Sequence, residues 1–299
     1  MSGSRRIDQM GRRQFVKLSG AAGAGGLLTL AGADGGMADG GDGPPQPSPP
    51  PNPGGTACPT PSALCGYPTD SGGRFDLWDR VQVCLGTRTS PPTNCLRTTS
   101  TYVVLNGAPP NTHNYLLVPT CRVQGIECPF IATAAAPNYW LDAWINAQPG
   151  QPSHVVYPNI GLGINSADAR QQDQLHIHLA GIHSGIQTQL NSHDNLISNN
   201  PANWRNQIVP IWGLTSGGAP APRSYRVLHV SNLNDNLFTL LRDFVVRPTG
   251  ANMAHQAMAV TPRLVGNGGF YVINSEPALQ TPQGQPGGTG TVDFLLAYT

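Results

Sequence analysis

Two histidines, His176 and His178, stand at alternate positions in the apolar stretch QLHIHLAG. If this stretch is an extended strand, both imidazoles share one face and the apolar residues share the other. Two adjacent imidazoles can bind a metal ion, take part in phosphoryl transfer, or simply lie on a solvated face of a sheet. The metal interpretation needs further ligands, for which His183 and His193 are candidates.

Composition removes several classes of chemistry. Lys17 is the only lysine, so the folded part of the chain holds no phosphate-binding Walker lysine and no Schiff-base lysine. Glu127 and Glu276 are the only glutamates, and no pair of aspartates stands out as a general acid and base. Beyond residue 33 the chain carries 12 arginines against 15 acidic residues, a net charge of about −3 without basic runs. This balance argues against a nucleic acid as partner.

The first 33 residues resemble a twin-arginine export signal. Arg12 and Arg13 are adjacent, Lys17 follows, and a short run of small and apolar residues ends at Ala33. That run is shorter than the ~20 residues that a membrane-spanning helix needs. We therefore expect a signal peptide over residues 1–33, cleaved near Ala33 rather than kept as an anchor, and a Pro/Gly-rich linker over 34–57. The predicted location is the periplasm, the cell envelope or the medium.

All six cysteines lie in the first part of the folded region, between residues 58 and 128. In an exported protein an even number of cysteines predicts disulfides, here three. Fifteen connectivities are possible, but the short spacings favour local bridges. The expected pairs are Cys58–Cys65, Cys84–Cys95 and Cys121–Cys128.

Hydrophobic periodicity predicts a mixture of strands and helices in the region 58–275, followed by a tail over 276–299. Strands are expected at 101–107, 114–120, 157–165, 174–181, 224–230, 255–260 and 269–274, with the last two joined by a hairpin at GNGG. Helices are expected near 71–85, 137–147, 182–197 and 236–246, and a loop through residue 218.

Several short motifs in order resemble one known family. Asn165 precedes His176 by eleven residues, an arrangement similar to the histidine-triad hydrolases and transferases. Within that superfamily the chain resembles the CDP-diacylglycerol pyrophosphatases through VCLGTRTSPPTNC, YVVLNG, NYLLVPTCRVQGIECP, APNYWLDAW, INSADAR and QLHIHL. The resemblance covers about residues 75–190 and continues loosely to 275. Two departures are Gln174 at the first triad position and Thr120 after Pro119, where the wider superfamily often has lysine.

The resemblance implies an α+β fold: a histidine-triad-like antiparallel sheet flanked by helices. Residues 220–275 are expected to form an additional C-terminal αβ part, either a further layer or a degenerate second half. It implies hydrolysis of CDP-diacylglycerol to CMP and phosphatidate through a nucleotidyl-histidine, with no metal or other cofactor. His176 would be the nucleophile, and His178 and Asn165 would assist it. Gln174 and Arg170 would contact the substrate.

Two other functions remain open on the sequence alone. One is a soluble nucleotide pyrophosphatase or nucleotidyl transferase that uses the same histidine. The other is a non-catalytic protein that binds a nucleotide or metal, in which Gln174 marks lost activity.

A lipid substrate also suggests peripheral contact with a membrane. Phe130, Ile131, Tyr139 and Trp140 could provide an apolar surface for it, or could be core residues.

Overall fold

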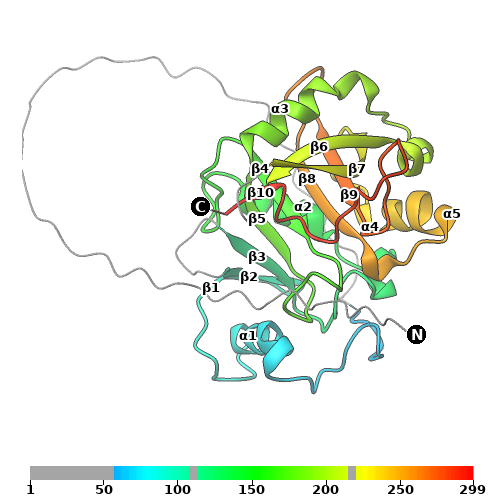
Figure 1. Cartoon of the computed structure of the whole chain (residues 1–299). Coiled ribbons are helices and arrows are strands. Elements are labelled where there is room, and N and C mark those ends of the chain that lie inside the picture. Colours follow the sequence, from blue (N-terminus) through cyan, green and yellow to red (C-terminus); the bar gives the residue numbers. More distant parts are fainter. Residues whose placement is uncertain (1–56, 108–113, 215–219, 299) are drawn as a thin grey trace, which may run out of the picture. The chain divides into compact units, whose positions relative to one another are not determined.

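Antiparallel strands dominate the computed structural model, which describes residues 57–107, 114–214 and 220–298 (Figure 1). The expected signal peptide and nearly all of the expected linker lie outside these residues. Within the described ranges, no helix combines the length and apolar character needed to cross a membrane.

The described strands form one large sheet. They are β1 (Cys95–Thr98), β2 (Tyr102–Asn106), β3 (Tyr115–Pro119), β4 (Ile160–Ile164), β5 (Ile177–Ile182), β6 (Ile208–Leu214), β7 (Pro220–Val230), β8 (Ala257–Pro262), β9 (Phe270–Ser275) and β10 (Leu296–Ala297). The order across the sheet is β1-β2-β3-β5-β4-β8-β9-β7-β6, and β10 pairs with β5. Every pairing is antiparallel.

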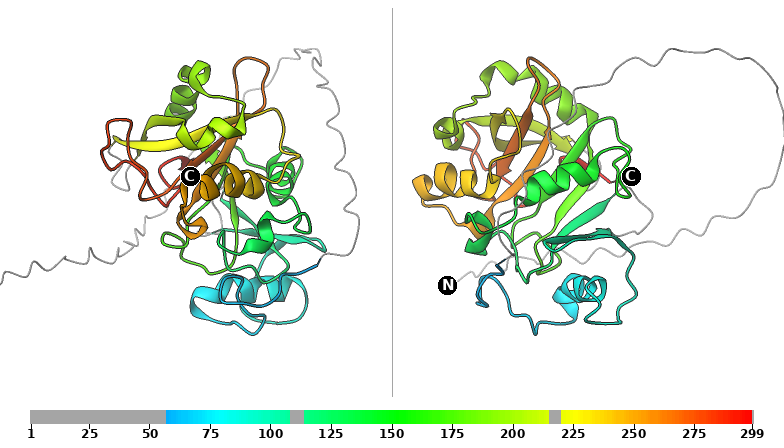
Figure 2. Two further views of the ribbon diagram at one scale, coloured as in Figure 1. Left: turned by 90° about the vertical axis from the view of Figure 1, so that its right-hand side faces the viewer. Right: turned by 180° about the vertical axis from the view of Figure 1, so that it is seen from behind.

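Helices lie on both faces of this sheet. They are α1 (Asp76–Cys84), α2 (Tyr139–Ala147), α3 (Ser184–Ser192), α4 (Leu237–Leu241) and α5 (Arg247–Thr249), with a π-helical turn over Arg242–Val246. Short 3-10 helices occupy Gly73–Phe75, Pro129–Ala132, Asp194–Leu196, Pro201–Asn206 and Met253–His255. Seen from behind, α2 crosses the middle of the sheet (Figure 2). The prediction of an antiparallel sheet flanked by helices is therefore confirmed.

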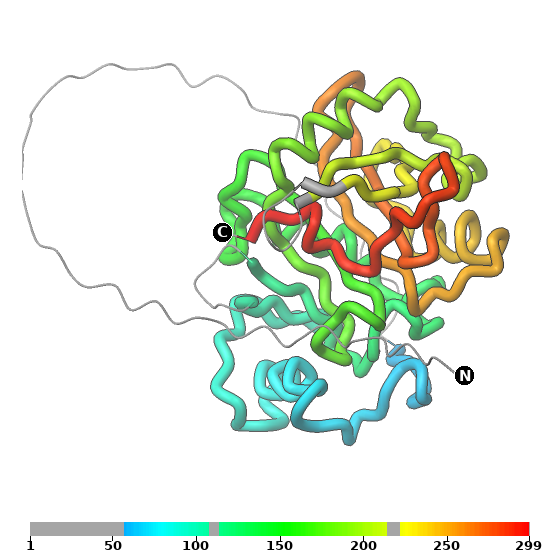
Figure 3. The backbone as a smooth tube through the Cα atoms, viewed as in Figure 1, coloured from blue at the N-terminus to red at the C-terminus, as the bar shows by residue number. Residues whose placement is uncertain are grey.

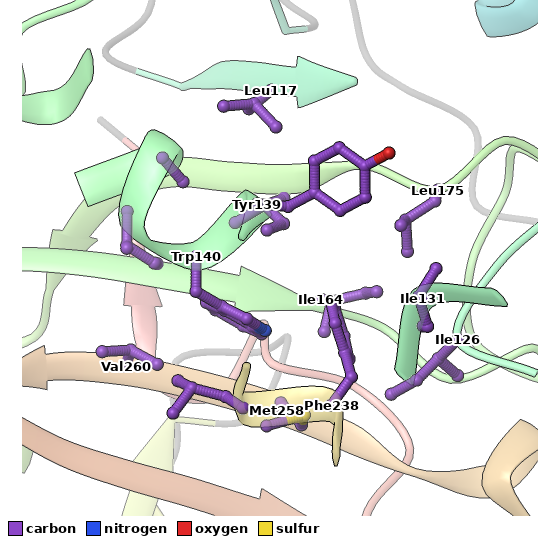
Figure 4. Close-up of a cluster of buried hydrophobic side chains, with 14 of the residues drawn as sticks. Leu117, Ile126, Ile131, Tyr139, Trp140, Ile164, Leu175, Phe238, Met258 and Val260 are labelled. Carbon is purple, nitrogen blue, oxygen red and sulfur yellow. The ribbon is translucent and has the colours of Figure 1, made fainter. Parts of the chain in front are cut away.

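The largest hydrophobic core lies between one face of the sheet and the helices α2 and α4, which cover that face. Trp140 of α2 packs against Phe238 of α4 with ring centroids 5.5 Å apart (Figure 4). Ile131 and Tyr139 belong to the same cluster and are buried, and Phe130 is half-buried against it. For Ile131, Tyr139 and Trp140 this burial supports the core interpretation over a lipid-contacting surface, because they supply the apolar area that holds α2 and the Pro129–Ala132 turn on the sheet.

The opposite face is covered by two separate groups of side chains. Trp78 and Val81 of α1 pack on the β2 and β3 end of the sheet. Ile186 of α3 packs with Leu296 of the C-terminal segment on the C-terminal strands. His178 of β5 and the preceding His176 lie on this face, between the two groups, because the even-numbered residues here point away from α2.

The disulfides differ from the expected pairing in two of three bonds. Cys84–Cys95 is confirmed, but Cys58 bonds to Cys121 and Cys65 to Cys128. The two segments lie side by side, since Gln124 N donates to the carbonyl of Cys65 over 2.9 Å. Each of these two segments carries two cysteines seven residues apart. The cysteines pair between the segments and do not close a small loop within either one.

The C-terminal half continues the same sheet through β8, β9, β7 and β6. Residues 208–214, expected in a loop, form β6 at the edge of the sheet, where Pro210 is tolerated because an edge strand has one unpaired side. The expected helix over 182–197 is shorter, because Ile182 still belongs to β5 and α3 ends at Ser192. Residues 290–298, expected in a tail, lie along the sheet and contribute β10.

Candidate active site

The histidine pair is held by the central strand of the sheet. His176 immediately precedes β5 and His178 lies within it, opposite Leu116 of β3 and Gly163 of β4. Their rings are 5.1 Å apart, centroid to centroid, at an interplanar angle of 69°. The alternation seen in the sequence therefore places both imidazoles on one face, as predicted.

A backbone hydrogen bond fixes the protonation pattern of His176. Its Nδ1 lies 2.7 Å from the carbonyl oxygen of Gln174. Because a carbonyl oxygen only accepts, Nδ1 carries the proton and Nε2 carries the lone pair. Burial lowers the pKa of His176, and the nearby positive charge of Arg170 lowers it further. His176 is thus a neutral imidazole whose nucleophilic nitrogen is Nε2.

His178 is held by an asparagine from the neighbouring strand. Its Nδ1 lies 3.1 Å from Oδ1 of Asn114, which precedes β3. Burial lowers the pKa of His178 to about 3, with a contribution from His176. Nε2 of His178 is buried and has no hydrogen-bond partner among the described residues. An unpaired buried nitrogen beside a second imidazole is a position where a substrate atom can bind.

Gln174 is fully buried, and all four of its side-chain hydrogen bonds are made inside the protein. Oε1 accepts from Nη1 of Arg122 over 3.0 Å and from the backbone N–H of Val123 over 3.3 Å. Nε2 donates to the carbonyls of Pro119 and Cys121 over 3.2 and 3.0 Å. The side chain thus ties the start of β5 to the end of β3.

Arg170 belongs to a buried ionic network. Its Nη1 and Nη2 form a bidentate pair with Glu127 at 2.7 and 2.6 Å, and its Nε bonds to Asp173 at 3.0 Å. Asp173 also accepts two bonds from Arg74, which precedes α1. Gly125 makes room for this network, since a Cβ there would lie 2.1 Å from Nη1 of Arg170. The network fixes the turn that leads into His176.

Asn165 lies just after β4, near the same edge of the site. Its Oδ1 accepts a hydrogen bond from the backbone N–H of Val292 over 2.8 Å. This bond leads to the C-terminal segment, in which the ring of Tyr298 lies 5.6 Å from that of His178. Neither Asn114 nor Tyr298 was identified from the sequence. Asn114 could have been predicted, because it begins the strand motif NYLLVP, which pairs with the strand of QLHIHL. No sequence pattern near Tyr298 indicates its contact with His178.

The candidate metal ligands are not brought together. His183 precedes α3 and His193 follows it, so the helix separates the two. Among the described residues no group of three or more His, Cys, Asp or Glu side chains is arranged to hold a metal ion.

The family match and the two relatives described below all carry the same name. Residues 73–289 match the family described as CDP-diacylglycerol pyrophosphatase. A CDP-diacylglycerol pyrophosphatase of Yersinia pestis is 42% identical over 104 residues, which is 33% of this chain and 37% of that protein. A probable CDP-diacylglycerol pyrophosphatase of Mycobacterium leprae is 32% identical over 160 residues, 50% of this chain and 53% of that protein. The aligned parts thus span about a third to a half of these relatives. Because the family match covers well over half of its residues, including both histidines, the chain belongs to the CDP-diacylglycerol pyrophosphatase family.

Proposed function

We propose that this protein hydrolyses the pyrophosphate bond of CDP-diacylglycerol, releasing CMP and phosphatidate, through a nucleotide bound covalently to His176. The observation that carries the proposal is the hydrogen bond from Nδ1 of His176 to the carbonyl of Gln174. It leaves the lone pair on Nε2 and stabilises the positive charge that the ring acquires when Nε2 forms a bond.

In the first step Nε2 of His176 attacks the cytidylyl phosphorus. The N–P bond forms, the bond from phosphorus to the bridging oxygen breaks, and phosphatidate leaves with that electron pair. The anionic diphosphate favours protonation of the adjacent His178, whose Nε2 then donates its proton to the leaving oxygen. In the second step the oxygen of a water molecule attacks the phosphorus while Nε2 of His178 accepts a proton from that water. The new O–P bond forms, the N–P bond breaks with its electron pair returning to Nε2 of His176, and CMP is released.

The side-chain amide of Asn165 can serve two purposes: its oxygen binds the C-terminal segment, and its nitrogen is available for the substrate. Its Oδ1 accepts from Val292, so its amide nitrogen is the atom that can donate to a phosphate oxygen. For Gln174 and Arg170 the substrate contact suggested by the family resemblance stays a prediction. Their side-chain hydrogen bonds in the described structure go to protein atoms, which favours a role in positioning the turn before His176.

The fold type, the export route and the contact with a membrane are also proposals. We propose a histidine-triad-type fold, supported by the antiparallel sheet that carries the two alternating histidines. Export by the twin-arginine route is supported by the paired arginines of the first 33 residues and by three disulfides. A lipid-borne substrate would require peripheral contact with a membrane, made by residues other than the buried Ile131, Tyr139 and Trp140.

The test is incubation of the purified protein with CDP-diacylglycerol, CDP-choline and a dinucleotide, each with and without chelator. Release of CMP from CDP-diacylglycerol and acid-quench trapping of a nucleotidyl-protein are expected. His176→Ala should abolish both, while His178→Ala should slow turnover by ~10²- to 10⁴-fold, the usual contribution of a general acid–base group. The exposed His154 provides the matched control, His154→Ala. Full activity of His176→Ala would refute the nucleophile, and preference for a dinucleotide would favour a soluble nucleotide substrate.

A further inference from the structure

The C-terminal segment, residues 292–298, lies beyond the part of the chain that matches the family. Its red tube runs along the sheet in Figure 3, and its Tyr298 ring packs against the ring of His178. Within it β10 pairs with β5, with Leu296 opposite Ile182 and Ala297 opposite Gly181. The N–H of His183 also donates to the carbonyl of Leu295 over 3.0 Å. The segment is thus bonded to the strand that bears His178.

Two glycines of β4 allow this segment to pack closely on the strand. A Cβ on Gly163 would lie 2.7 Å from Cδ1 of Leu296 and 2.8 Å from Cγ2 of Val292. A Cβ on Gly161 would lie 2.7 Å from Cδ2 of Leu296. Carbon atoms in contact stay about 3.5–4.0 Å apart, so a side chain at either position would force the side chain of Leu296 to shift. The sequence IGLGI therefore accommodates the C-terminal segment next to His178.

Both ends of the segment are attached to site residues. At residue 292 the backbone N–H is bound by Asn165. At the other end the ring of Tyr298 meets the ring of His178 at 60°. The hydroxyl of Tyr298 donates to Asp293 over 2.9 Å, which closes the segment on itself.

We propose that residues 292–298 are a working part of the catalytic site, in which Tyr298 is a positioning residue that holds the imidazole of His178. This inference rests on the proposed role of His178. Three contacts restrain that ring: Asn114 holds Nδ1, and the rings of His176 and Tyr298 pack against it. Without the Tyr298 ring the imidazole can tilt away from the position that the substrate needs.

The kinetic test compares Tyr298→Ala, Tyr298→Leu and Tyr298→Phe with Tyr67→Ala, a control at an exposed tyrosine. Loss of the ring in the Ala and Leu variants should lower kcat by ~10- to 100-fold, the range for a catalytic group displaced by about 1 Å, with KM changed much less. The Phe variant should restore most of kcat, because it keeps the ring and loses only the bond to Asp293. Equal kcat in all four variants would overturn the proposal.

A second readout needs no substrate. In protein labelled on histidine, the His178 resonance, assigned by its disappearance in His178→Gln, is followed by NMR as pH is lowered. The groups that face this ring are His176 and Asn114 from the sheet, and Tyr298 with its partner Asp293. Removing the Tyr298 ring should raise the pKa of His178 from about 3 toward the ordinary 6.5, because burial is the main cause of its depression.

The two readouts separate this inference from the proposed function. If wild-type protein releases no CMP but the His178 titration responds to Tyr298→Ala, the function is wrong and the packing role holds. If wild-type protein is active while neither kcat nor the titration changes in the Ala and Leu variants, Tyr298 does not position His178.

Discussion

Replacing Gln174 by alanine tests whether this side chain holds the fold or binds the substrate. Its amide makes four hydrogen bonds and is completely buried. Each such bond contributes about 0.5–1.5 kcal/mol net, and a buried donor left without a partner costs about 1–3 kcal/mol. Arg122 keeps its two bonds to Asp70 in the variant, but the N–H of Val123 loses its side-chain acceptor. We therefore expect Gln174→Ala to lower the free energy of unfolding by about 3–4 kcal/mol.

The assay is equilibrium unfolding in guanidinium chloride with the disulfides intact, followed by fluorescence and circular dichroism. The matched control is Gln283→Ala, at an exposed glutamine, which should stay within about 0.5 kcal/mol of wild type. Gln174→His should also be destabilising, because a neutral imidazole offers one donor and one acceptor where the amide makes four bonds. Restoring the histidine of the superfamily is thus not expected to be neutral here.

Activity measured on the folded fraction completes the test. The bond that fixes His176 uses the backbone carbonyl of residue 174, so it does not depend on that residue's side chain. If the side chain is structural, folded Gln174→Ala keeps a KM close to that of wild type. A loss of stability below about 1 kcal/mol would refute the network argument, and a large rise in KM without loss of stability would restore the substrate-contact prediction.

Burial and connectivity lead to three further predictions. Because the pKa of His178 is lowered to about 3 by burial, the free energy of unfolding should fall as pH drops from about 6.5 toward 3, and His178→Gln should flatten this dependence in acid-unfolding experiments. Peptide mapping without reductant should recover Cys58 joined to Cys121, and recovery of Cys58 joined to Cys65 would contradict the structure. Ile131→Ser should lower the melting temperature and cost about 3 kcal/mol or more, whereas a stable variant with impaired binding to lipid vesicles would place Ile131 at a membrane surface.

The sequence alone determined most of the local structure and the placement of the two histidines on one face of a strand. Alternating residues predicted the strands that correspond to β2, β3, β4 and β5, and the period of two placed His176 and His178 on one face. The aromatic helix at α2 was likewise predicted, because its pattern is local. The even number of cysteines predicted three disulfides, and one pair, Cys84–Cys95, was correct because its partners are close in the chain.

Only the tertiary structure showed the features that depend on contacts between segments far apart in the chain. The two remaining disulfides join residues 63 positions apart, and no local spacing distinguishes them from short bridges. The strand β6 was missed because its Pro210 is compatible only with an edge position, which is a property of the whole sheet. Tyr298 reaches His178 only because β10 pairs with β5 over two glycines of β4. Periodicity describes which face a side chain takes within its own strand, and the neighbours that it meets there come from the pairing of strands far apart in the chain.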